Sequence, residues 1–419
     1  MKKYIFITTS LYQIGGIQCY LAQKTAHLEK EGWKVSIFFA ARLSSHTPSC
    51  PIPSLEKYLD GNMAAMSIPP YKMPKWMVNR TIGKMISIIG ESKSDDEIII
   101  ESHADTLSQW GELLASRINA RHYLFLMNER YRGAGKYYVD KMDFYIYKYS
   151  RKEILGSKNS FPRLFNGFLS ISPKDITTSV LVEESPVQDV FNKKVAQLPQ
   201  KDWNICYLGR GNKPYVPNIL SDVGKFASEN NNKTIQLIVV GDINIHRDLV
   251  KKVLSANSNL TITELGIIYP IPKMLYEKVD VVIANSGCAR HSCEEGAIVI
   301  VADPETKQSL GILGYETTNS VFRGEDSVVG TFSDALKRVL IDKAYLSMEN
   351  NYPPRIGIEK CIQQHFELFS QSERNKEYFN EGEMLKGSID YRLIMKKYLI
   401  YFCSKTIYKT RERKKMIII

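Results

Sequence analysis

Short apolar runs recur along the chain, and stretches with the period of an amphipathic helix separate several of them. The first group has apolar runs at 3–8 and 34–39 on either side of a helical pattern at 17–31. Short apolar runs of this kind predict buried strands, and a strand–helix–strand order favours parallel pairing. We therefore expect the chain to begin with a βαβ unit whose helix ends at Gly32.

The same alternation returns in both halves of the sequence. In the first half, strands are expected at 97–103 and 121–129, with an amphipathic helix at 107–120 between them. The second half predicts a helix at 219–231 and four strands, at 203–211, 234–242, 279–287 and 296–304. Strands that alternate with helices indicate open α/β domains with parallel sheets. Residues 42–75 lack a regular period and predict an inserted loop with short elements.

Charged residues and prolines mix at 183–201, as they do in connections between domains. We therefore expect two Rossmann-like domains, at 1–190 and 201–375, followed by C-terminal helices and a basic tail at 376–419. In open parallel sheets, ligands bind at the carboxyl ends of the strands. The expected site is a cleft across which the two domains face each other.

Composition narrows the class of protein. The 419 residues are 44% hydrophobic and 24% charged, which suits a globular chain with two cores. Seven scattered cysteines indicate reduced thiols in a cytosolic protein rather than a disulfide framework. No second pair at zinc spacing accompanies Cys288 and Cys293, so no metal site is expected. The apolar run at 4–8 is too short for a signal peptide, and no run is long enough to span a bilayer.

The positive charge is concentrated at the C-terminal end. The net charge is +11, and residues 405–419 hold six Lys and Arg but one Glu. A basic end indicates a polyanionic partner, either an anionic membrane or nucleic acid. Aromatic and aliphatic residues at 393–402 precede it and suit a membrane interface, although a helix packed across both domains is the alternative. We expect the segment at 393–402 to pack across both domains and residues 405–419 to contact a membrane. No nucleic-acid partner is expected, because no recognisable nucleic-acid-binding module is present.

Gly15 and Gly16 stand between the first strand and the first helix. A glycine pair there permits positive φ and lets a ligand approach the backbone, and the helix N-terminus beyond it can receive a phosphate. The G-x-G-x-x-G fingerprint of dinucleotide binding is absent. A tight turn without a ligand is the alternative.

A second glycine-containing cluster follows the strand expected at 203–211. Gly209 and Arg210 precede Lys213 by a few residues. Arg offers a planar fork and Lys a mobile point charge, and together they suit a diphosphate. A solvated basic turn is the alternative.

A third cluster follows the strand expected at 279–287. Its small residues would open a helix whose backbone N–H groups point at a phosphate; they are Ser286, Gly287 and Cys288. Ordinary packing is the alternative for Cys288 and Cys293. A position on a helix face is the alternative for His291, and a solvated helix end is the alternative for Glu294.

The strand expected at 97–103 ends in polar residues, of which His103 is the last. A histidine at a strand end in a cleft is a candidate general base, or a hydrogen-bond donor to a substrate hydroxyl. Glu129 ends the next strand and would face the same cleft. A structural histidine with satisfied hydrogen bonds is the alternative. Walker A, G-x-S-x-G and H-E-x-x-H sequences are absent, and so is an Asp-x-Asp pair that would indicate metal-clamped sugar-nucleotide binding.

Together these clusters resemble the GT-B glycosyltransferases, most nearly family 4 ("glycosyl transferases group 1") of the bacterial surface-polysaccharide type. The stretch GGIQ at 15–18 looks like that family's GG-I-Q/E, and 209–213 looks like its G-R-x-x-x-K diphosphate clamp, one residue tighter. VGD at 240–242 is similar to its V-G-x-G strand end, which adds Gly241 to the candidates. Residues 296–303 resemble G-x-P-V-I-A-x-D. The matches are spread over roughly the whole chain.

The chain departs from the family at one motif. The E-x7-E pair should lie between Asp280 and Gly296, where this sequence has no such pair. The segment SGCARHSCEEG at 286–296 is closer in length to the S-G-x-x-x-E-E segment of UDP-N-acetylglucosamine 2-epimerases, whose serine and glycine hold the nucleotide phosphates. By this similarity 286–288 is the phosphate loop and Glu294 lies near the ribose.

The resemblance implies a retaining, metal-independent glycosyltransferase without a cofactor. It would move a sugar from a UDP- or GDP-linked donor to a glycan or lipid-linked acceptor, in lipopolysaccharide or capsule synthesis. Arg210 and Lys213 would neutralise the leaving diphosphate, and His103 and Glu129 would orient the acceptor or the transferred sugar. The implied location is cytoplasmic, on the inner face of the plasma membrane.

Two alternatives stay open. One is a sugar-nucleotide epimerase on the same fold, against which Arg290 and His291 count because that chemistry needs carboxylates near the sugar ring. The other is a catalytically lapsed GT-B protein that serves as the partner of an active transferase, since the E-x7-E pair is absent.

Overall fold

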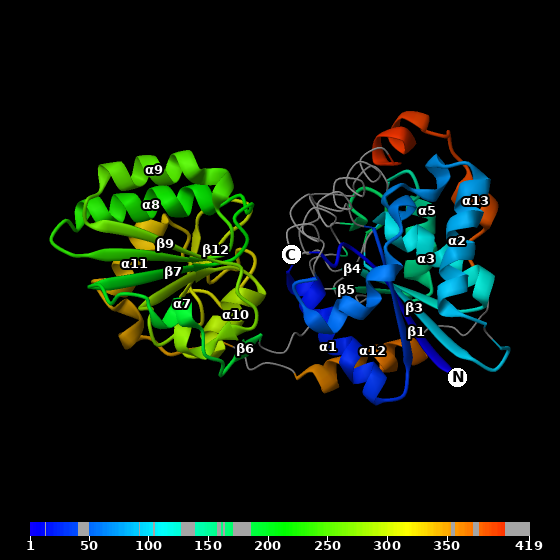
Figure 1. Cartoon of the computed structure of the whole chain (residues 1–419), viewed down its shortest axis with the longest axis horizontal. Helices are drawn as coiled ribbons and strands as arrows, with labels where there is room; N and C mark the ends of the chain where they lie inside the picture. Colours follow the sequence, from blue (N-terminus) through cyan, green and yellow to red (C-terminus); the bar gives the residue numbers. More distant parts are fainter. Residues whose placement is uncertain are drawn as a thin grey trace, which may run out of the picture. The chain divides into compact units, whose positions relative to one another are not determined.

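The computed structural model of the chain describes residues 1–12, 14–40, 50–91, 93–103, 105–126, 139–156, 161, 164–170, 186–352, 357–371 and 377–398. The chain divides into two compact units (Figure 1). Unit 1 comprises Met1–Glu184 and Ile356–Ile419, and unit 2 comprises Ser185–Arg355. Each unit is an α/β domain built on its own sheet.

Unit 1 has a five-stranded sheet in the order β2-β1-β3-β4-β5. Its strands are β1 (Lys2–Thr8), β2 (Lys34–Phe39), β3 (Glu97–Ser102), β4 (Arg121–Leu126) and β5 (Ile154–Gly156). Every neighbouring pair is parallel, and Ile5 lies opposite Ser36 on one side and Ile100 on the other. The predicted βαβ start and parallel sheet are therefore confirmed. The strands are mostly apolar because helices cover both faces of a parallel sheet.

The helices of unit 1 are α1 (Gly16–Lys30), α2 (Lys75–Ile89), α3 (Asp105–Ile118), α5 (Met142–Ser150), α12 (Ile358–Gln371) and α13 (Glu381–Leu385). Within the segment expected to be an irregular insertion, three 3₁₀ helices lie at Pro53–Gly61, Ala64–Ser67 and Pro70–Lys72. Helix α2 was not predicted, although its buried residues, Val78, Ile82, Met85 and Ile89, recur every three or four positions.

The C-terminal part of the chain returns to unit 1. The ring of Phe369 in α12 stacks on Tyr123 of β4 with their centroids 3.9 Å apart. Further on, Lys141 donates hydrogen bonds to the carbonyl oxygens of Glu383 (2.6 Å) and Lys386 (2.8 Å). The expected second domain, 201–375, therefore extends too far, because α12 belongs to unit 1. The expected domain boundary was placed from the order of elements along the sequence, and that order does not indicate that the chain packs against unit 1 again after unit 2.

Unit 2 has a six-stranded sheet in the order β13-β12-β11-β7-β8-β9. Its strands are β7 (Trp203–Leu208), β8 (Ile235–Val240), β9 (Leu260–Gly266), β11 (Val281–Ala284), β12 (Val299–Ala302) and β13 (Ser309–Ile312). Its helices are α7 (Lys193–Ala196), α8 (Val216–Glu229), α9 (Arg247–Ala256), α10 (Gly287–Glu294) and α11 (Phe332–Leu340), with 3₁₀ turns at Asn244–His246, Lys273–Leu275 and Ala344–Ser347. A separate two-stranded ladder pairs β6 (Val187–Gln188) with β10 (Ile271–Pro272).

Two apolar clusters cover the two faces of the unit 2 sheet. Ile205 and Tyr207 of β7 pack into one cluster with α8 and α11, whereas Cys206 and Leu208 pack into the other with α7 and α10. Figure 1 shows α8 and α9 on one side of this sheet and α7 and α10 on the opposite side. This alternation is the two-residue period of a strand that is buried on both faces. The predicted second open α/β domain is confirmed, with the parallel strand β9 and the antiparallel strand β13 as additions.

Candidate functional site

The carboxyl edge of the unit 2 sheet gathers the glycine-containing clusters of the second half. Strand β7 is central, and the chain builds outward from it to β8 and β9 before it returns to the other side of β7 with β11. The strand order therefore reverses between β7 and β11, and ligands of open α/β sheets bind at such a point. The loops that leave β7, β8 and β11 begin at Gly209, Gly241 and Asn285.

The loops after β7 and β8 approach each other backbone to backbone. A Cβ atom on Gly211 would lie 1.8 Å from the carbonyl oxygen of Asp242, and one on Gly241 would lie 2.0 Å from that of Gly209. Gly241 also has a φ of +149°, which side chains rarely adopt. The sequence singled out Gly209 and Gly241, and the structure adds Gly211 as a position where only glycine fits.

The turn at 210–213 holds both predicted cations. The amide of Lys213 donates to the carbonyl of Arg210 at 3.2 Å, so the two residues are the ends of one turn. The hydroxyl of buried Tyr207 donates to the same carbonyl at 2.8 Å, and Nε2 of His246 bonds the carbonyl of Gly211 at 2.9 Å. The structure thus brings Arg210 and Lys213 together on an anchored backbone. Tyr207 and His246 were not predicted, because Tyr207 acts through the fold of the turn after its own strand and His246 through a contact between two loops.

The loop after β11 contains a strained residue. Ser286 has φ 59° and ψ −131°, a conformation that non-glycine residues rarely adopt, and it directly precedes α10. Its amide donates to the carbonyl of Ser320 at 2.7 Å, and the Asn285 side chain donates to the carbonyl of Ala302 at 2.7 Å. Strain of this kind persists where surrounding bonds hold it, and it clusters at ligand sites.

Helix α10 begins at Gly287, and in the described structure no side-chain hydrogen bond from its N-cap, Ser286, satisfies the first-turn amides. Those amides and the helix dipole favour an anion at this end. Cys288 is half-buried and packs against the apolar cluster of α7 and α10. Burial raises the pKa of neighbouring Cys206 to about 12, so that thiol stays protonated.

Glu294 is the last residue of α10. It lies seven positions after Gly287, which corresponds to about 10 Å along the axis. One of its carboxylate oxygens lies 3.5 Å from Nδ1 of His291. The helix therefore places Glu294 at the end opposite the candidate phosphate loop.

The first loop of unit 1 differs in detail from expectation. Gly15 is the N-cap of α1, and its φ of 175° is extended backbone that any residue adopts. A Cβ atom there would lie 3.2 Å from the mobile end of the Gln18 side chain. Positive φ is therefore not the reason for Gly15, and the role of Gly15 and Gly16 in ligand approach stays a prediction.

His103 is fully buried rather than open to a ligand. Its Nε2 donates to Oε1 of Glu101 at 2.6 Å, and its Nδ1 bonds the hydroxyl of Thr8 at 2.9 Å. Phe6, Tyr20 and Phe125 surround the ring. Both ring nitrogens are thus satisfied inside unit 1, which favours the structural alternative. Glu129, the other residue expected to orient the acceptor, lies outside the described residues, as does the basic tail at 405–419.

Glu101 is the centre of this buried network. Its carboxylate accepts hydrogen bonds from Tyr4 (2.5 Å), Tyr20 (2.9 Å) and Lys24 (2.6 Å) as well as from His103. Burial by itself would raise the pKa of Glu101, but the charge of Lys24 and the bond from His103 outweigh it and hold the pKa well below its usual range. Lys24 completes its three donor bonds with Tyr20 and with Nδ1 of His365 in α12.

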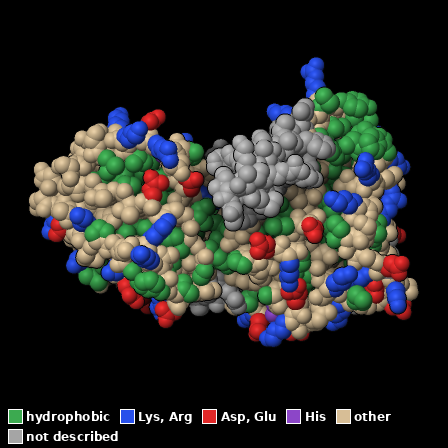
Figure 2. Space-filling model, in the orientation of Figure 1, with side chains coloured by type: hydrophobic (Ala, Val, Ile, Leu, Met, Phe, Trp, Pro, Cys, Tyr) green, Lys and Arg blue, Asp and Glu red, His purple; other side chains and the backbone are tan. Residues whose placement is uncertain are grey.

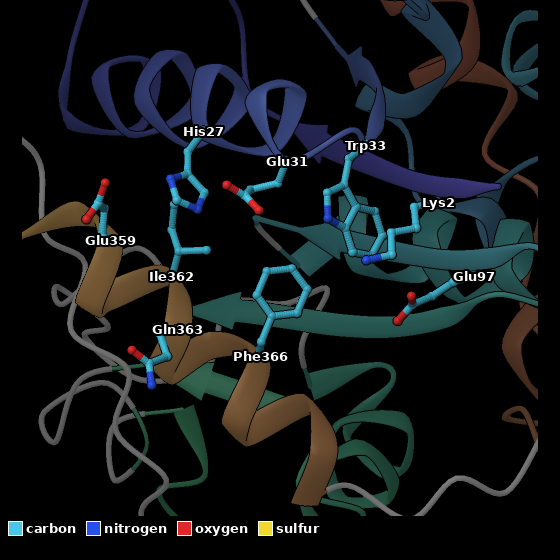
Figure 3. Close-up of a pocket in the computed structure, with 9 residues that line it drawn as sticks. All are labelled: Lys2, His27, Glu31, Trp33, Glu97, Glu359, Ile362, Gln363 and Phe366. Atoms are coloured by element: carbon cyan, nitrogen blue, oxygen red, sulfur yellow. The ribbon is translucent and has the colours of Figure 1, made fainter.

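A pocket of about 510 Å³ lies elsewhere in unit 1 (Figure 3). Figure 3 shows side chains from the end of α1 and from α12 around it, together with Lys2 and Glu97 from the first residues of β1 and β3. It therefore lies at the amino edge of the sheet, away from the strand ends where ligands of parallel sheets bind. No motif in the sequence indicates this pocket.

The described residues contain neither a metal cluster nor a membrane-spanning helix. Among them, His, Cys, Asp and Glu side chains do not gather in groups of three that could hold a metal ion. Within the same part of the chain, every helix is too short or too polar to cross a membrane.

Solved structures share this architecture. The chain is similar to a glycosyltransferase from Rickettsia africae ESF-5, with 14% identity and a TM-score of 0.55 over 95% of this chain and 98% of that one. It is also similar to Anabaena Alr3699/HepE in complex with UDP, with 12% identity and a TM-score of 0.53 over 88% of this chain and 100% of that one. A third similar structure is S. aureus MnaA with UDP, with 14% identity and a TM-score of 0.50 over 91% of this chain and 100% of that one. The chain has a GT-B fold. No protein-family model and no curated protein sequence matches it. At these identities the likeness concerns the fold.

Proposed function

We propose that this GT-B chain is an enzyme that uses a nucleoside diphosphate sugar. The observation that carries the proposal is the carboxyl edge of unit 2, where tightly packed glycine loops, an anchored turn with two cations and a strained serine before a helix adjoin one another. Backbone amides at a helix N-terminus and an Arg–Lys pair are suited to a diphosphate. Two of the similar solved structures are complexes with UDP, which supports the same ligand class.

The reaction we propose is transfer of the sugar to a hydroxyl of a glycan or lipid-linked acceptor. The bond between the anomeric carbon and the diphosphate oxygen breaks, the bond to the acceptor oxygen forms, and the hydroxyl proton leaves with the diphosphate or solvent. Negative charge grows on the diphosphate oxygen as its bond breaks. Arg210, Lys213 and the amides at 287–289 would neutralise that charge, which is where electrostatic stabilisation accelerates group transfer most.

Several finer features belong to the same proposal. They are retention of configuration, independence of metal, a role in surface-polysaccharide synthesis, Gly15 and Gly16 at the ligand, an acceptor site on unit 1, and contact of 405–419 with the inner face of the plasma membrane. The sequence resemblance supports the first five, and the basic composition of 405–419 supports the last. Deleting 405–419 and comparing binding to anionic and neutral vesicles tests the last of these features.

The test of the proposed clamp is nucleoside diphosphate release with a panel of UDP- and GDP-sugars. Arg210→Ala and Lys213→Ala are each expected to lower kcat at least about 100-fold, as removal of one transition-state donor does. Lys252→Ala, an exposed lysine on α9 of the same unit, is the control and should leave kcat unchanged. Unchanged turnover in both clamp variants would remove the assignment.

Epimerisation of the sugar nucleotide is the second candidate. A TM-score of 0.50 to a putative UDP-N-acetylglucosamine 2-epimerase from Listeria monocytogenes (13% identity, 91% of this chain and 99% of that one) favours it. Incubation of UDP-N-acetylglucosamine without acceptor, followed by NMR of the anomeric protons, separates the two candidates. A new sugar nucleotide would indicate an epimerase, and nucleotide binding without either reaction would indicate a lapsed partner protein.

A further inference from the structure

Exposed apolar side chains gather on one part of unit 1. Figure 2 shows a patch of hydrophobic side chains, bordered by Lys and Arg, over the segment drawn red in Figure 1. That segment contains a helical turn at 391–398, in which Tyr391 and Met395 are 65% and 63% exposed. They are four residues apart and therefore lie on the same face of the turn. Ile394, on the other face, packs into the core of unit 1.

The start of α2 adjoins this segment. The amide of Asp390 donates to the carbonyl of Lys72 at 3.1 Å, just before α2. The ammonium of Lys75 lies 3.7 Å from Glu381, which belongs to the helix just before this segment. Trp76, the second residue of α2, is 64% exposed. The two segments thus present an exposed Trp, Tyr and Met on adjoining surface.

The charge around these side chains is positive. Arg392 and Lys396 are exposed and spaced like Tyr391 and Met395, so an apolar stripe and a cationic stripe run side by side along the turn. Residues 75–90 contain Lys75, Arg80 and Lys84 and no acid, and of these cations Lys75 pairs with Glu381 of α13. Asp390 is the one acid in 386–398, and its carboxylate accepts the amide of Leu393 at 2.9 Å.

We propose that this face of unit 1, formed by Trp76, Tyr391 and Met395 with their flanking cations, docks on an anionic lipid surface. Trp and Tyr suit the headgroup region because their rings are apolar with one polar end. Lysine is depleted from the centres of protein–protein interfaces, whereas it is attracted to anionic headgroups. The abundance of cations around the patch therefore favours lipid over a protein partner. The docking face is separate from 405–419 and does not depend on the proposed sugar-nucleotide chemistry.

The first experiment measures sedimentation of the full-length protein with phosphatidylcholine vesicles that contain about 30% phosphatidylglycerol, the anionic component that recruits basic surfaces. Trp76→Ser with Tyr391→Ser and Met395→Ser should weaken binding at least about ten-fold, because the apolar area that enters the interface is lost. Arg392→Gln with Lys396→Gln should weaken it about 25-fold, at about five-fold per cation.

Matched controls lie on unit 2. Phe191 and Leu346 are 78% and 71% exposed, and Phe191→Ser with Leu346→Ser should bind vesicles as the unaltered protein does. All five replaced apolar side chains are exposed, so circular dichroism should show unchanged folding. A protein that lacks 405–419 should still bind vesicles. Adding the serine substitutions at Trp76, Tyr391 and Met395 to that deletion should weaken the remaining binding.

Fluorescence adds a readout at the residue itself. Among the four tryptophans, Trp33 and Trp110 are buried and Trp203 is partly buried, whereas Trp76 is exposed. Brominated lipids should quench Trp76 on binding, and Trp76→Phe should abolish that quenching. Wild-type binding by the triple serine variant, or complete loss of binding on deletion of 405–419, would overturn the proposal. Conversion of a dimer to a monomer by the triple variant would overturn it too, because the face would then bind a second copy.

Discussion

The buried ion pair between Lys24 and Glu101 allows a quantitative test of how unit 1 is held together. The Nζ and Oε2 atoms are 2.6 Å apart, and both side chains are inaccessible to solvent. Lys24→Met keeps most of the side-chain volume and removes the charge. It leaves the Glu101 carboxylate buried without its main counter-charge, and it removes the donor to His365 in α12.

The expected loss in free energy of unfolding for Lys24→Met depends on which groups still contact the Glu101 carboxylate. Loss of one partner of a buried pair costs about 3–5 kcal/mol. Glu101 would keep hydrogen bonds from Tyr4, Tyr20 and His103, so we expect the lower end, about 3 kcal/mol. Lys57→Met is the matched control: Lys57 and Glu29 are also 2.6 Å apart, but their side chains are 55% and 38% exposed. Exposed pairs contribute about 0–1 kcal/mol.

The assay is urea denaturation followed by tryptophan fluorescence. Trp203 is the one tryptophan of unit 2, so a Trp203→Phe background reports on unit 1 through Trp33, Trp76 and Trp110. Lys24→Met combined with Glu101→Gln should recover at least half of the lost stability, because the unpaired charge is then gone. A loss in Lys24→Met no larger than that in Lys57→Met would refute this account of the network.

Three further predictions test other parts of the structure. Burial lowers the pKa of His365 well below its ordinary value, so below about pH 6.5 the unfolded chain binds more protons than the folded chain. The free energy of unfolding of unit 1 should therefore decrease as the pH falls below about 6.5, by at most about 1.4 kcal/mol per pH unit. In His365→Gln, the urea midpoint should depend less on pH. Gly211→Ala should weaken nucleotide binding by calorimetry at least about ten-fold, because its Cβ would meet the Asp242 carbonyl, whereas Gly83→Ala, with open space on α2, should stabilise unit 1 by about 0.5–1 kcal/mol. Phe369→Ala should cost unit 1 about 3–5 kcal/mol in urea denaturation and leave the unit 2 transition unmoved, although α12 follows unit 2 in sequence.

Hydrophobic periodicity predicted most strands of both sheets, because strands buried on both faces appear as continuous apolar runs between helical patterns, but it did not predict β5, β9 or β13. The runs at 3–8, 203–211 and 234–242 all contain strands of parallel sheets. Helix α2 was not predicted because it directly follows the irregular segment at 42–75. Its pattern of Val78, Ile82 and Met85 was nevertheless present in the sequence.

The candidate site was predictable in part. Glycines and cations after strands pointed to Gly209, Arg210 and Lys213, since the carboxyl ends of parallel strands share one edge. The close approach of Gly211 to Asp242 was not predictable, because it depends on how two loops pack. The burial of His103 likewise depends on residues far along the chain, since Glu101, its main partner, is itself held by Lys24 and two tyrosines.

Hydrogen–deuterium exchange with and without UDP or GDP is the decisive test of the nucleotide site on unit 2, because a ligand that binds the folded state protects the amides it contacts. We predict protection at 209–213, 241–242 and 286–289 in unit 2, with no change at the pocket lined by Trp33 and Phe366. Protection at that pocket, or none at the three loops under saturating nucleotide, would contradict the assignment of the carboxyl edge of unit 2 as the nucleotide-sugar site.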